Sequence, residues 1–545
     1  MLKYFPSGYT PTSKQEAVFD LVSDKFFSDK KFLIIQAPTG TGKSFIAKTI
    51  ANMTRESSSR YRELVDSGDI YKTDLHGEYI YKDQVYREKP HGCFSLTITK
   101  TLQDQYKSLF EDTEILKGKG NYECALDSNF EVDTAPCVYL NEQKKKCLDN
   151  KCCFYYNAID STLKSQFGCL SYSKFLSMED HLKRRQYLVL DEASELESEL
   201  VKEFTFTLPY RDLKKKGINF VYSINRDKLY EGLFDCLSEL REYLLDAKKH
   251  ITKKSSNFTH KSRLILDYKK YYRIFRGLKN LIRTFKESKY IVEKDGLEVT
   301  FTPRKVDLLS RHIFAHAEKV VLLSATIVGV KSFVKSLGIS NEDYDFIDID
   351  STFDPKMSPI LIYTDTPLNN KNLVKTLPTL VDRIEGILEH HPNEKGIIHT
   401  QSNNITDFIK NFIGRKYNNR LLFREPGIKN EDILKAHIES KEPTVLVSPS
   451  MGYGIDLKDD LGRFQVIVKL PYLPWLDKRV VAIRETDKKW YTLQMLSSLI
   501  QACGRTTRGE NDYSVTYIMD STFLKIRREY YNDLPVYFNK RCVNS

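Results

Sequence analysis

The sequence predicts an α/β protein with two domains, each built around a parallel β-sheet. Short apolar runs that suit buried strands alternate with longer stretches of helical pattern, as in parallel sheets covered by helices. One set of runs lies before about residue 345 and a second set follows it. With 545 residues, the chain is also too long for one ordinary domain. The expected strand cores are 32–35, 95–98, 187–190 and 320–323 in the first set, and 396–398, 444–447 and 465–468 in the second.

Composition and charge limit the class of protein. Hydrophobic residues make up 41% and charged residues 29%, which is typical of a folded chain rather than a disordered one. The sequence has no apolar run of about 18 residues and no secretory leader pattern, so we expect no membrane association and a location in the cytoplasm, at a nucleoid, or in a nucleus. The formal net charge of +11 favours a polyanionic partner, although many basic proteins bind no nucleic acid.

A glycine-rich loop follows the first expected strand and precedes a helical pattern. Its glycines allow backbone N–H groups to surround phosphate oxygens at the N-terminus of a helix. In such a loop, Lys43 reaches the β- and γ-phosphates and the Ser44 hydroxyl is a ligand of Mg²⁺. We therefore interpret this segment as a site for ATP. Its residues are Ala37, Pro38, Thr39, Gly40, Thr41, Gly42, Lys43 and Ser44.

Two acidic residues end the expected strand at 187–190. Asp191 at the strand end suits a magnesium ligand, and Glu192 suits a group that orients the attacking water. An Asp-Glu pair after a strand is usually a solvated turn. Downstream of a phosphate loop, the catalytic interpretation is favoured.

The second half of the chain carries a glutamine and two arginines that suit phosphoryl chemistry. Gln501, Arg505 and Arg508 lie in one short segment, and the two arginines share one side of a helical turn. Guanidinium groups stabilise the charge that develops on a transferred γ-phosphoryl group. The alternative is an exposed basic turn.

Five cysteines fall within one short segment: Cys124, Cys137, Cys147, Cys152 and Cys153. In a reducing compartment such clustering favours metal ligation over disulfides. Zinc sites prefer closely paired cysteines, which only Cys147 and Cys152 approach, whereas iron–sulfur clusters use four thiolates. An iron–sulfur cluster, a zinc site and a vestigial site are therefore the alternatives.

Two stretches depart from the strand–helix alternation. Residues 111–160 are rich in Cys, Lys and Asn and show no series of strands, and residues 204–300 have a helical pattern. The expected helix around Tyr271–Phe285 carries many basic residues beside its apolar stripe. They form either a solvated face or a face for nucleic acid.

The order of these motifs resembles the XPD/DinG family of superfamily 2 iron–sulfur DNA helicases over nearly the whole chain. Further matching segments are Thr97–Gln105, Lys117–Cys124, Phe301–Pro303, Ser324–Thr326, Gly454–Leu457 and Arg508–Asp512. The sequence departs from the family pattern at Ser194, where His is usual, at Tyr453, where Glu is usual, and before Gln15, where an Arg is missing.

The resemblance implies an arrangement of domains and adds residues to the site. We expect a first RecA-like motor domain at 1–110, 161–203 and 301–345, an Fe–S cluster insertion at 111–160, a helical arch at 204–300 and a second RecA-like motor domain at 346–545. Gln15 is expected to contact adenine and Asp456 to contribute to the nucleotide site. A 4Fe–4S cluster is expected on Cys124, Cys137, Cys147 and Cys153, with Cys153 preferred over Cys152 because aromatic residues follow it.

The same resemblance implies an ATP-dependent, Mg²⁺-requiring helicase that moves 5′→3′ on single-stranded DNA and unwinds forked or 5′-tailed duplexes, working as a monomer. The alternatives are a translocase that does not unwind and a structure-specific DNA-binding protein. Tyr106, Tyr122, Tyr155 and Tyr156 are candidates for base stacking, with core packing as the alternative for each.

Overall fold

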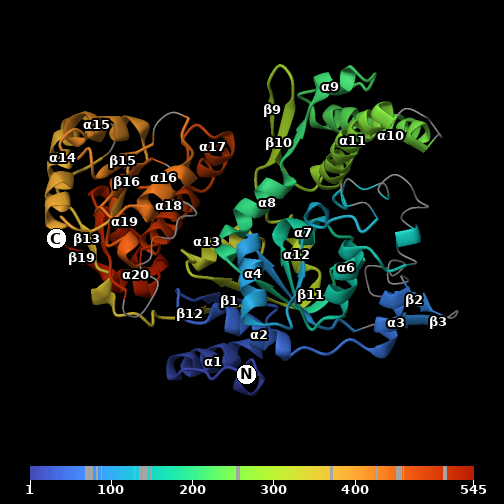
Figure 1. The fold of residues 1–545 in the computed structure, drawn as a ribbon, viewed down its shortest axis with the longest axis horizontal. Helices are drawn as coiled ribbons and strands as arrows, with labels where there is room; N and C mark the ends of the chain where they lie inside the picture. Colours follow the sequence, from blue (N-terminus) through green and yellow to red (C-terminus); the bar gives the residue numbers. More distant parts are fainter. Residues whose placement is uncertain are drawn as a thin grey trace.

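The computed structural model shows two α/β lobes joined in one chain, with a pair of long helices beyond the first lobe (Figure 1). The described residues are 1–67, 78–81, 84–87, 89–126, 128, 130–133, 135, 137, 145–147, 150–252, 258–368, 372–424, 427–449, 457, 459–506 and 512–544. None of the helices in these ranges is both long enough and apolar enough to cross a membrane.

The first lobe is built on a seven-stranded sheet whose neighbouring strands all pair in parallel. The strands predicted at 32–35, 95–98, 187–190 and 320–323 are all present in it. In spatial order the strands are β12 (Tyr344–Asp348), β1 (Phe32–Gln36), β11 (Ala317–Ser324), β7 (Arg185–Leu190), β4 (Cys93–Thr97), β6 (Phe167–Ser171) and β5 (Glu114–Leu116).

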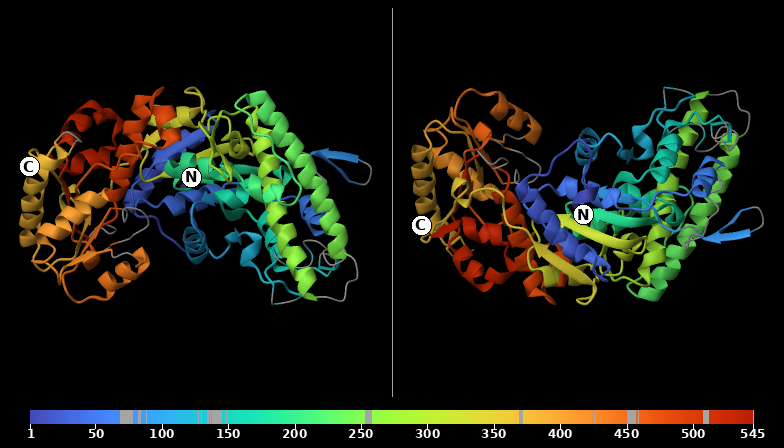
Figure 2. Two further views of the ribbon diagram at one scale, coloured as in Figure 1. Left: turned by 90° about the horizontal axis from the view of Figure 1, so that it is seen from above. Right: turned by 90° about the horizontal axis from the view of Figure 1, so that it is seen from below.

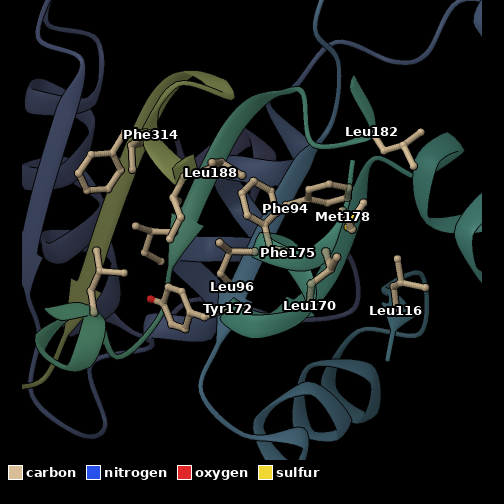
Figure 3. Close-up of a cluster of buried hydrophobic side chains, with 14 of the residues drawn as sticks. Phe94, Leu96, Leu116, Leu170, Tyr172, Phe175, Met178, Leu182, Leu188 and Phe314 are labelled. Atoms are coloured by element: carbon tan, nitrogen blue, oxygen red, sulfur yellow. The ribbon is translucent and has the colours of Figure 1, made fainter. Parts of the chain in front are cut away.

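Helices cover both faces of this sheet because its strands are apolar on both sides. Along β1, Phe32 and Ile34 join one buried cluster, while Leu33 and Ile35 join another. Figure 3 shows part of the first cluster, in which Phe94 of β4 lies among side chains from neighbouring strands and helices. The helices of this lobe are α1 (Ser13–Phe26), α2 (Lys43–Asn52), α3 (Ser59–Ser67), α4 (Lys100–Leu109), α6 (Phe154–Lys164), α7 (Tyr172–Ser177), α8 (Leu196–Phe204), α12 (Arg311–Phe314) and α13 (Val330–Ser336).

The register of the central strands brings three of the predicted motifs to one edge of the sheet. Gln36 at the end of β1 pairs with Ser324 at the end of β11, and Leu322 pairs with Leu190 at the end of β7. The phosphate loop, the acidic pair and the segment from Ser324 therefore start side by side. Ligands of open parallel sheets bind at this carboxyl edge.

The second lobe contains a second seven-stranded parallel sheet. The strands predicted at 396–398, 444–447 and 465–468 are present. The spatial order is β15 (Leu421–Phe423), β16 (Val445–Ser448), β14 (Gly396–His399), β17 (Phe464–Ile467), β18 (Val515–Ile518), β13 (Ile360–Ile362) and β19 (Cys542–Asn544). Its helices are α14 (Leu373–His390), α15 (Asn403–Ile413), α16 (Asn430–Glu439), α17 (Lys478–Arg484), α18 (Lys488–Cys503), α19 (Thr522–Glu529) and α20 (Val536–Arg541).

The stretch expected to be helical contains α9 (Tyr210–Lys214) and two long helices, α10 (Arg226–Thr252) and α11 (Phe258–Phe285), which lie side by side at the end of the molecule far from the second lobe (Figure 2). It also contains a three-stranded antiparallel sheet that the helical pattern did not predict. Its order is β8 (Phe206–Leu208), β10 (Val299–Pro303) and β9 (Tyr290–Lys294). A separate hairpin, β2 (Glu78–Tyr81) and β3 (Gln84–Arg87), precedes β4.

Part of the basic face of α11 is engaged within the protein. An Arg273 guanidinium nitrogen lies 3.6 Å from Asp133 Oδ2, in the cysteine-rich stretch. Arg276 donates a hydrogen bond of 3.5 Å to the Ser177 carbonyl, and Lys270 forms an ion pair of 2.5 Å with Asp212. These three side chains are nevertheless exposed, so the contacts leave the face open to solvent, and its role as a solvated face or a face for nucleic acid stays a prediction.

Candidate active site between the two lobes

The phosphate loop has the backbone that its glycines predict. Gly40 and Gly42 have φ angles of 87° and 90°, in the left-handed region that disfavours residues with a Cβ atom. A Cβ at Gly42 would also lie 2.9 Å from Gln15 Nε2. Helix α2 begins at Lys43, directly after the loop, so its first N–H groups point into the loop and can bind an anion.

Two side chains of the loop are held by its own carbonyl groups. Thr41 Oγ1 donates a hydrogen bond of 2.7 Å to the Pro38 carbonyl and is buried. Lys43 Nζ donates a hydrogen bond of 3.0 Å to the Ala37 carbonyl across the loop. The Lys43 ammonium group therefore already lies over the space that phosphates would occupy.

Gln15 is fixed beside the loop by the start of α1. Its backbone N–H donates to Thr12 Oγ1 at 3.2 Å, and its Oε1 accepts from the Thr12 N–H at 3.0 Å, forming a reciprocal cap. This cap leaves the Gln15 amide group against Gly42 and in the wall of the cavity.

The carboxylate of Asp191 is buried at the end of β7, with only 4% of the residue exposed. Its Oδ2 accepts a hydrogen bond of 3.0 Å from the Tyr106 hydroxyl, and its Oδ1 accepts one of 3.0 Å from the Glu192 N–H. Burial raises the pKa of Asp191, while Lys43 and these two donors lower it. Glu192 has a φ of 52°, which turns the chain sharply after the strand.

The second lobe contributes Gln501 from the last turn of α18. Gln501 Nε2 donates to Glu195 Oε1 at 2.9 Å and to Ser194 Oγ at 3.3 Å, both in the first lobe. Ser194 Oγ also accepts a bond of 2.9 Å from Ser324 Oγ. Ser194, one of the departures from the family pattern, therefore connects three of the predicted motifs.

A cavity of about 740 Å³ lies between the lobes where these motifs meet. Ala37 and Thr41 of the phosphate loop do not line the cavity, because both residues are buried. Arg508 and Asp456 lie outside the described residues, so their predicted roles stay predictions. The predicted site residues that line the cavity are Gln15, Pro38, Thr39, Gly40, Gly42, Lys43, Ser44, Asp191, Glu192, Gln501 and Arg505.

The residues at this site fit a magnesium ion. The Ser44 hydroxyl and the Asp191 carboxylate line the same cavity, and both supply the oxygen ligands that Mg²⁺ prefers. They are close to the phosphate loop, where a nucleotide would supply further oxygen ligands.

Several residues of the site were not predicted from the sequence. Phe353, from the segment between the lobes, lies against Gly40 and lines the cavity. Arg541, in α20, also lines it and donates bonds of 2.7 and 3.1 Å to the carbonyls of Ser358 and Cys503. Tyr106, a candidate for base stacking, is only 1% exposed and contacts Asp191 instead. None of them belongs to a sequence motif, so no signal in a single sequence would identify them.

Three of the four cysteines predicted to hold a cluster are buried. Cys124, Cys147 and Cys153 are 7%, 4% and 5% exposed, and Cys153 immediately precedes α6. Cys137 is partly exposed, as is Cys152, whose thiol points to the Cys147 carbonyl at 3.8 Å.

The thiols are near enough to affect one another. Burial raises the pKa of Cys137, and Cys153 and Cys124 raise it further. Burial likewise raises the pKa of Cys147 to about 12, with contributions from Cys152, Cys137 and Cys153. Within the described part of the chain, no three His, Cys, Asp or Glu side chains are placed to hold a metal ion. Four thiols in one region fit the chemistry of a four-thiolate cluster, and the cluster itself stays a prediction.

Comparison with known proteins gives sequence matches to DNA helicases. Residues 384–541 match the family model described as a helicase C-terminal domain. The chain is 24% identical over 317 residues to the ATP-dependent DNA helicase CHL1 of Scheffersomyces stipitis. The matched region covers 50% of this chain and 37% of that protein. The chain is 25% identical over 240 residues to the ATP-dependent DNA helicase XPD of Sulfolobus acidocaldarius, covering 40% and 39%. The matched region is therefore less than half of each relative.

Solved structures show the same fold. An XPD helicase structure covers 98% of this chain with a TM-score of 0.58 and 17% identity, and this chain covers 100% of it. A structure of Xpd4 from S. tokodaii covers 98% with a TM-score of 0.51 and 14% identity, and 99% of it is covered. The predicted resemblance to XPD/DinG-like superfamily 2 helicases and the two-lobed α/β architecture are both confirmed.

Proposed function

We propose that this chain is an ATP-dependent DNA helicase that moves along single-stranded DNA. One observation carries the proposal: the cavity between the lobes is lined by Lys43, Asp191 and Glu192 from one lobe and by Gln501 and Arg505 from the other. A site divided between two lobes can open and close with the state of the nucleotide. The names of the similar helicases support DNA as the substrate.

Each residue of the site then has a role in hydrolysis. The loop N–H groups and Lys43 bind the phosphates of ATP, and Glu192 orients the attacking water. Ser44 and Asp191 would hold Mg²⁺, which neutralises charge on the phosphates when it is bound. Gln501 contacts Glu195, three residues after Glu192, so it joins the second lobe to the catalytic acids.

We further propose 5′→3′ movement and a 4Fe–4S cluster on Cys124, Cys137, Cys147 and Cys153. Movement in this direction rests on the resemblance to the family. The cluster is supported by the burial of three of the four thiols and by their mutual effect on pKa. Bound there, the cluster would cross-link the ends of a long segment and so hold its loops together.

The test of the nucleotide site is Lys43→Ala compared with the wild-type protein. We expect the variant to lose ATP hydrolysis, because no other loop side chain replaces the Lys43 ammonium group, and to keep its affinity for single-stranded DNA. Hydrolysis is measured with single-stranded DNA, duplex DNA and RNA, and unwinding with 5′-tailed and 3′-tailed duplexes. Undiminished hydrolysis by Lys43→Ala would falsify the site, and unwinding of only 3′-tailed duplexes would contradict the proposed direction. Hydrolysis without unwinding would indicate a translocase.

A further inference from the structure

Tyr106 contacts the reacting site through one buried hydrogen bond. We propose that Tyr106 is a positioning residue, which holds the Asp191 carboxylate in the orientation that a divalent cation at the nucleotide site requires. The inference rests on the proposed ATP-hydrolysing function and adds to it a residue outside the helicase motifs. Tyr106 lies in α4, whereas Asp191 ends β7, so the bond of 3.0 Å joins two elements that are distant in sequence.

The hydrogen bonds of Asp191 fix both of its carboxylate oxygens. The Tyr106 hydroxyl binds Oδ2 and the Glu192 N–H binds Oδ1, each at 3.0 Å. An ionised carboxylate has about four lone-pair directions, so two donors leave others available for a cation. With both oxygens bound, the group cannot rotate about its last bond without breaking a contact. The carboxylate is therefore oriented before any ligand enters.

The Tyr106 side chain is itself held in place. It projects from the middle of α4, whose start is capped by Thr99 Oγ1 accepting from the Leu102 N–H at 3.3 Å. Its ring packs edge-on against Phe167, with 5.7 Å between ring centroids. A phenol is protonated at neutral pH, because its usual pKa is about 10. The Tyr106 hydroxyl therefore donates its hydrogen bond to the carboxylate.

A second tyrosine provides a matched control. Tyr172 is 1% exposed, like Tyr106, and its hydroxyl donates a hydrogen bond of 3.0 Å to the backbone carbonyl of the same Asp191. Like Tyr106→Phe, Tyr172→Phe removes one buried phenolic hydroxyl that is hydrogen-bonded to Asp191. It frees the main chain rather than the carboxylate, so a general loss of packing would affect both variants alike.

The experiment compares wild type, Tyr106→Phe and Tyr172→Phe. Binding of Mn²⁺ with ADP is measured by electron paramagnetic resonance, with Mn²⁺ replacing Mg²⁺, and hydrolysis is measured as Mg²⁺ is titrated. Loss of an outer partner of a metal ligand typically weakens metal binding about 10- to 100-fold. We expect a shift of this size for Tyr106→Phe, a much smaller shift for Tyr172→Phe, and unchanged ADP binding when EDTA is present.

A double variant shows whether the effect passes through the carboxylate. In an Asp191→Asn background, Tyr106→Phe should cause little further loss of Mn²⁺ binding, because the group it orients is gone. Equal cation binding by Tyr106→Phe and wild type would overturn the inference, as would equal losses for both tyrosine variants or a full additional loss in the Asp191→Asn background. If the wild-type chain binds ADP with Mn²⁺ but does not hydrolyse ATP, the proposed function fails while the positioning role stands. If the wild type binds no nucleotide, both fail.

Discussion

At the scale of single residues, neighbouring cysteines are in different environments. Cys153 is 5% exposed and affects the pKa of both Cys137 and Cys147. Cys152 is partly exposed, and its thiol is directed at the Cys147 carbonyl. The two side chains therefore differ in exposure, although both raise the pKa of Cys147. Because Cys153 and Cys124 both raise the pKa of Cys137, we expect Cys153 rather than Cys152 to complete a set with Cys124 and Cys137.

This difference predicts which cysteine holds iron. Protein purified without oxygen should contain about four irons per chain if four thiolates hold one 4Fe–4S cluster. Cys153→Ser should lose this iron and its visible absorbance, whereas Cys152→Ser should keep both. Iron content and absorbance are measured, with thermal unfolding as a check that both variants fold. Stoichiometric zinc in place of iron would refute the cluster. If Cys152→Ser loses the iron and Cys153→Ser keeps it, Cys152 rather than Cys153 is the fourth ligand.

At the scale of elements, α18 contacts the first lobe at both of its ends. Near its start, Trp490 Nε1 donates a bond of 3.1 Å to Glu197 Oε2, and at its end Gln501 contacts Glu195. Glu197 Oε1 also accepts a hydrogen bond from Arg479 in α17. The helix thus lies along the segment that follows Asp191 and Glu192, so we expect movement of the second lobe to reach that segment.

The Glu197 contacts predict a test of how the lobes are held. Glu197→Ala leaves the Trp490 N–H and the Arg479 guanidinium without their acceptor in the first lobe, which we expect to cost about 1–3 kcal/mol. The free energy of unfolding in urea should fall by this amount, and fluorescence energy transfer should report more separated lobes. Glu199→Ala is the control, because Glu199 is in the same helix and its ion pair is with Lys202 in that helix. An equal change in both variants would show that α8 rather than the lobe contact is affected.

The elements that the sequence predicted are those with a strong local pattern. The strands at 32–35 and 187–190 are continuous apolar runs, and both have a neighbouring strand on each side in the first sheet. By contrast, β10 alternates buried Val299 and Phe301 with partly exposed threonines, a short pattern that a longer helical stretch obscures. The Tyr106–Asp191 contact depends on how α4 packs on the sheet. Such a contact between distant segments leaves no trace in local spacing.

At the scale of the whole molecule, the site is complete only when both lobes are in place. Hydrogen bonds connect the two lobes at several points. The Tyr537 hydroxyl donates a hydrogen bond of 3.1 Å to the Ala325 carbonyl, and the Gly329 N–H donates one of 2.9 Å to the Asp533 carbonyl. The three-stranded antiparallel sheet contacts the second lobe as well, since Arg479 Nε donates a hydrogen bond of 3.2 Å to the Pro303 carbonyl of β10. We therefore expect closure of the cavity to move this sheet together with the second lobe.

Arg505 tests whether this two-lobed site is catalytic. It comes from the second lobe and lines the same cavity as the phosphate loop of the first. An arginine that stabilises a transferred phosphoryl group contributes about 10³- to 10⁵-fold in rate. Lys keeps the charge but loses the planar fork.

We therefore expect Arg505→Lys to lose most DNA-stimulated ATP hydrolysis while single-stranded DNA still binds in a salt-sensitive way. Steady-state hydrolysis and DNA binding are measured, with Arg415→Lys, at an exposed position of the same lobe outside this cavity, as the control. Normal hydrolysis with weakened DNA binding would instead place Arg505 on the path of the strand, and catalysis between the lobes would then require another residue.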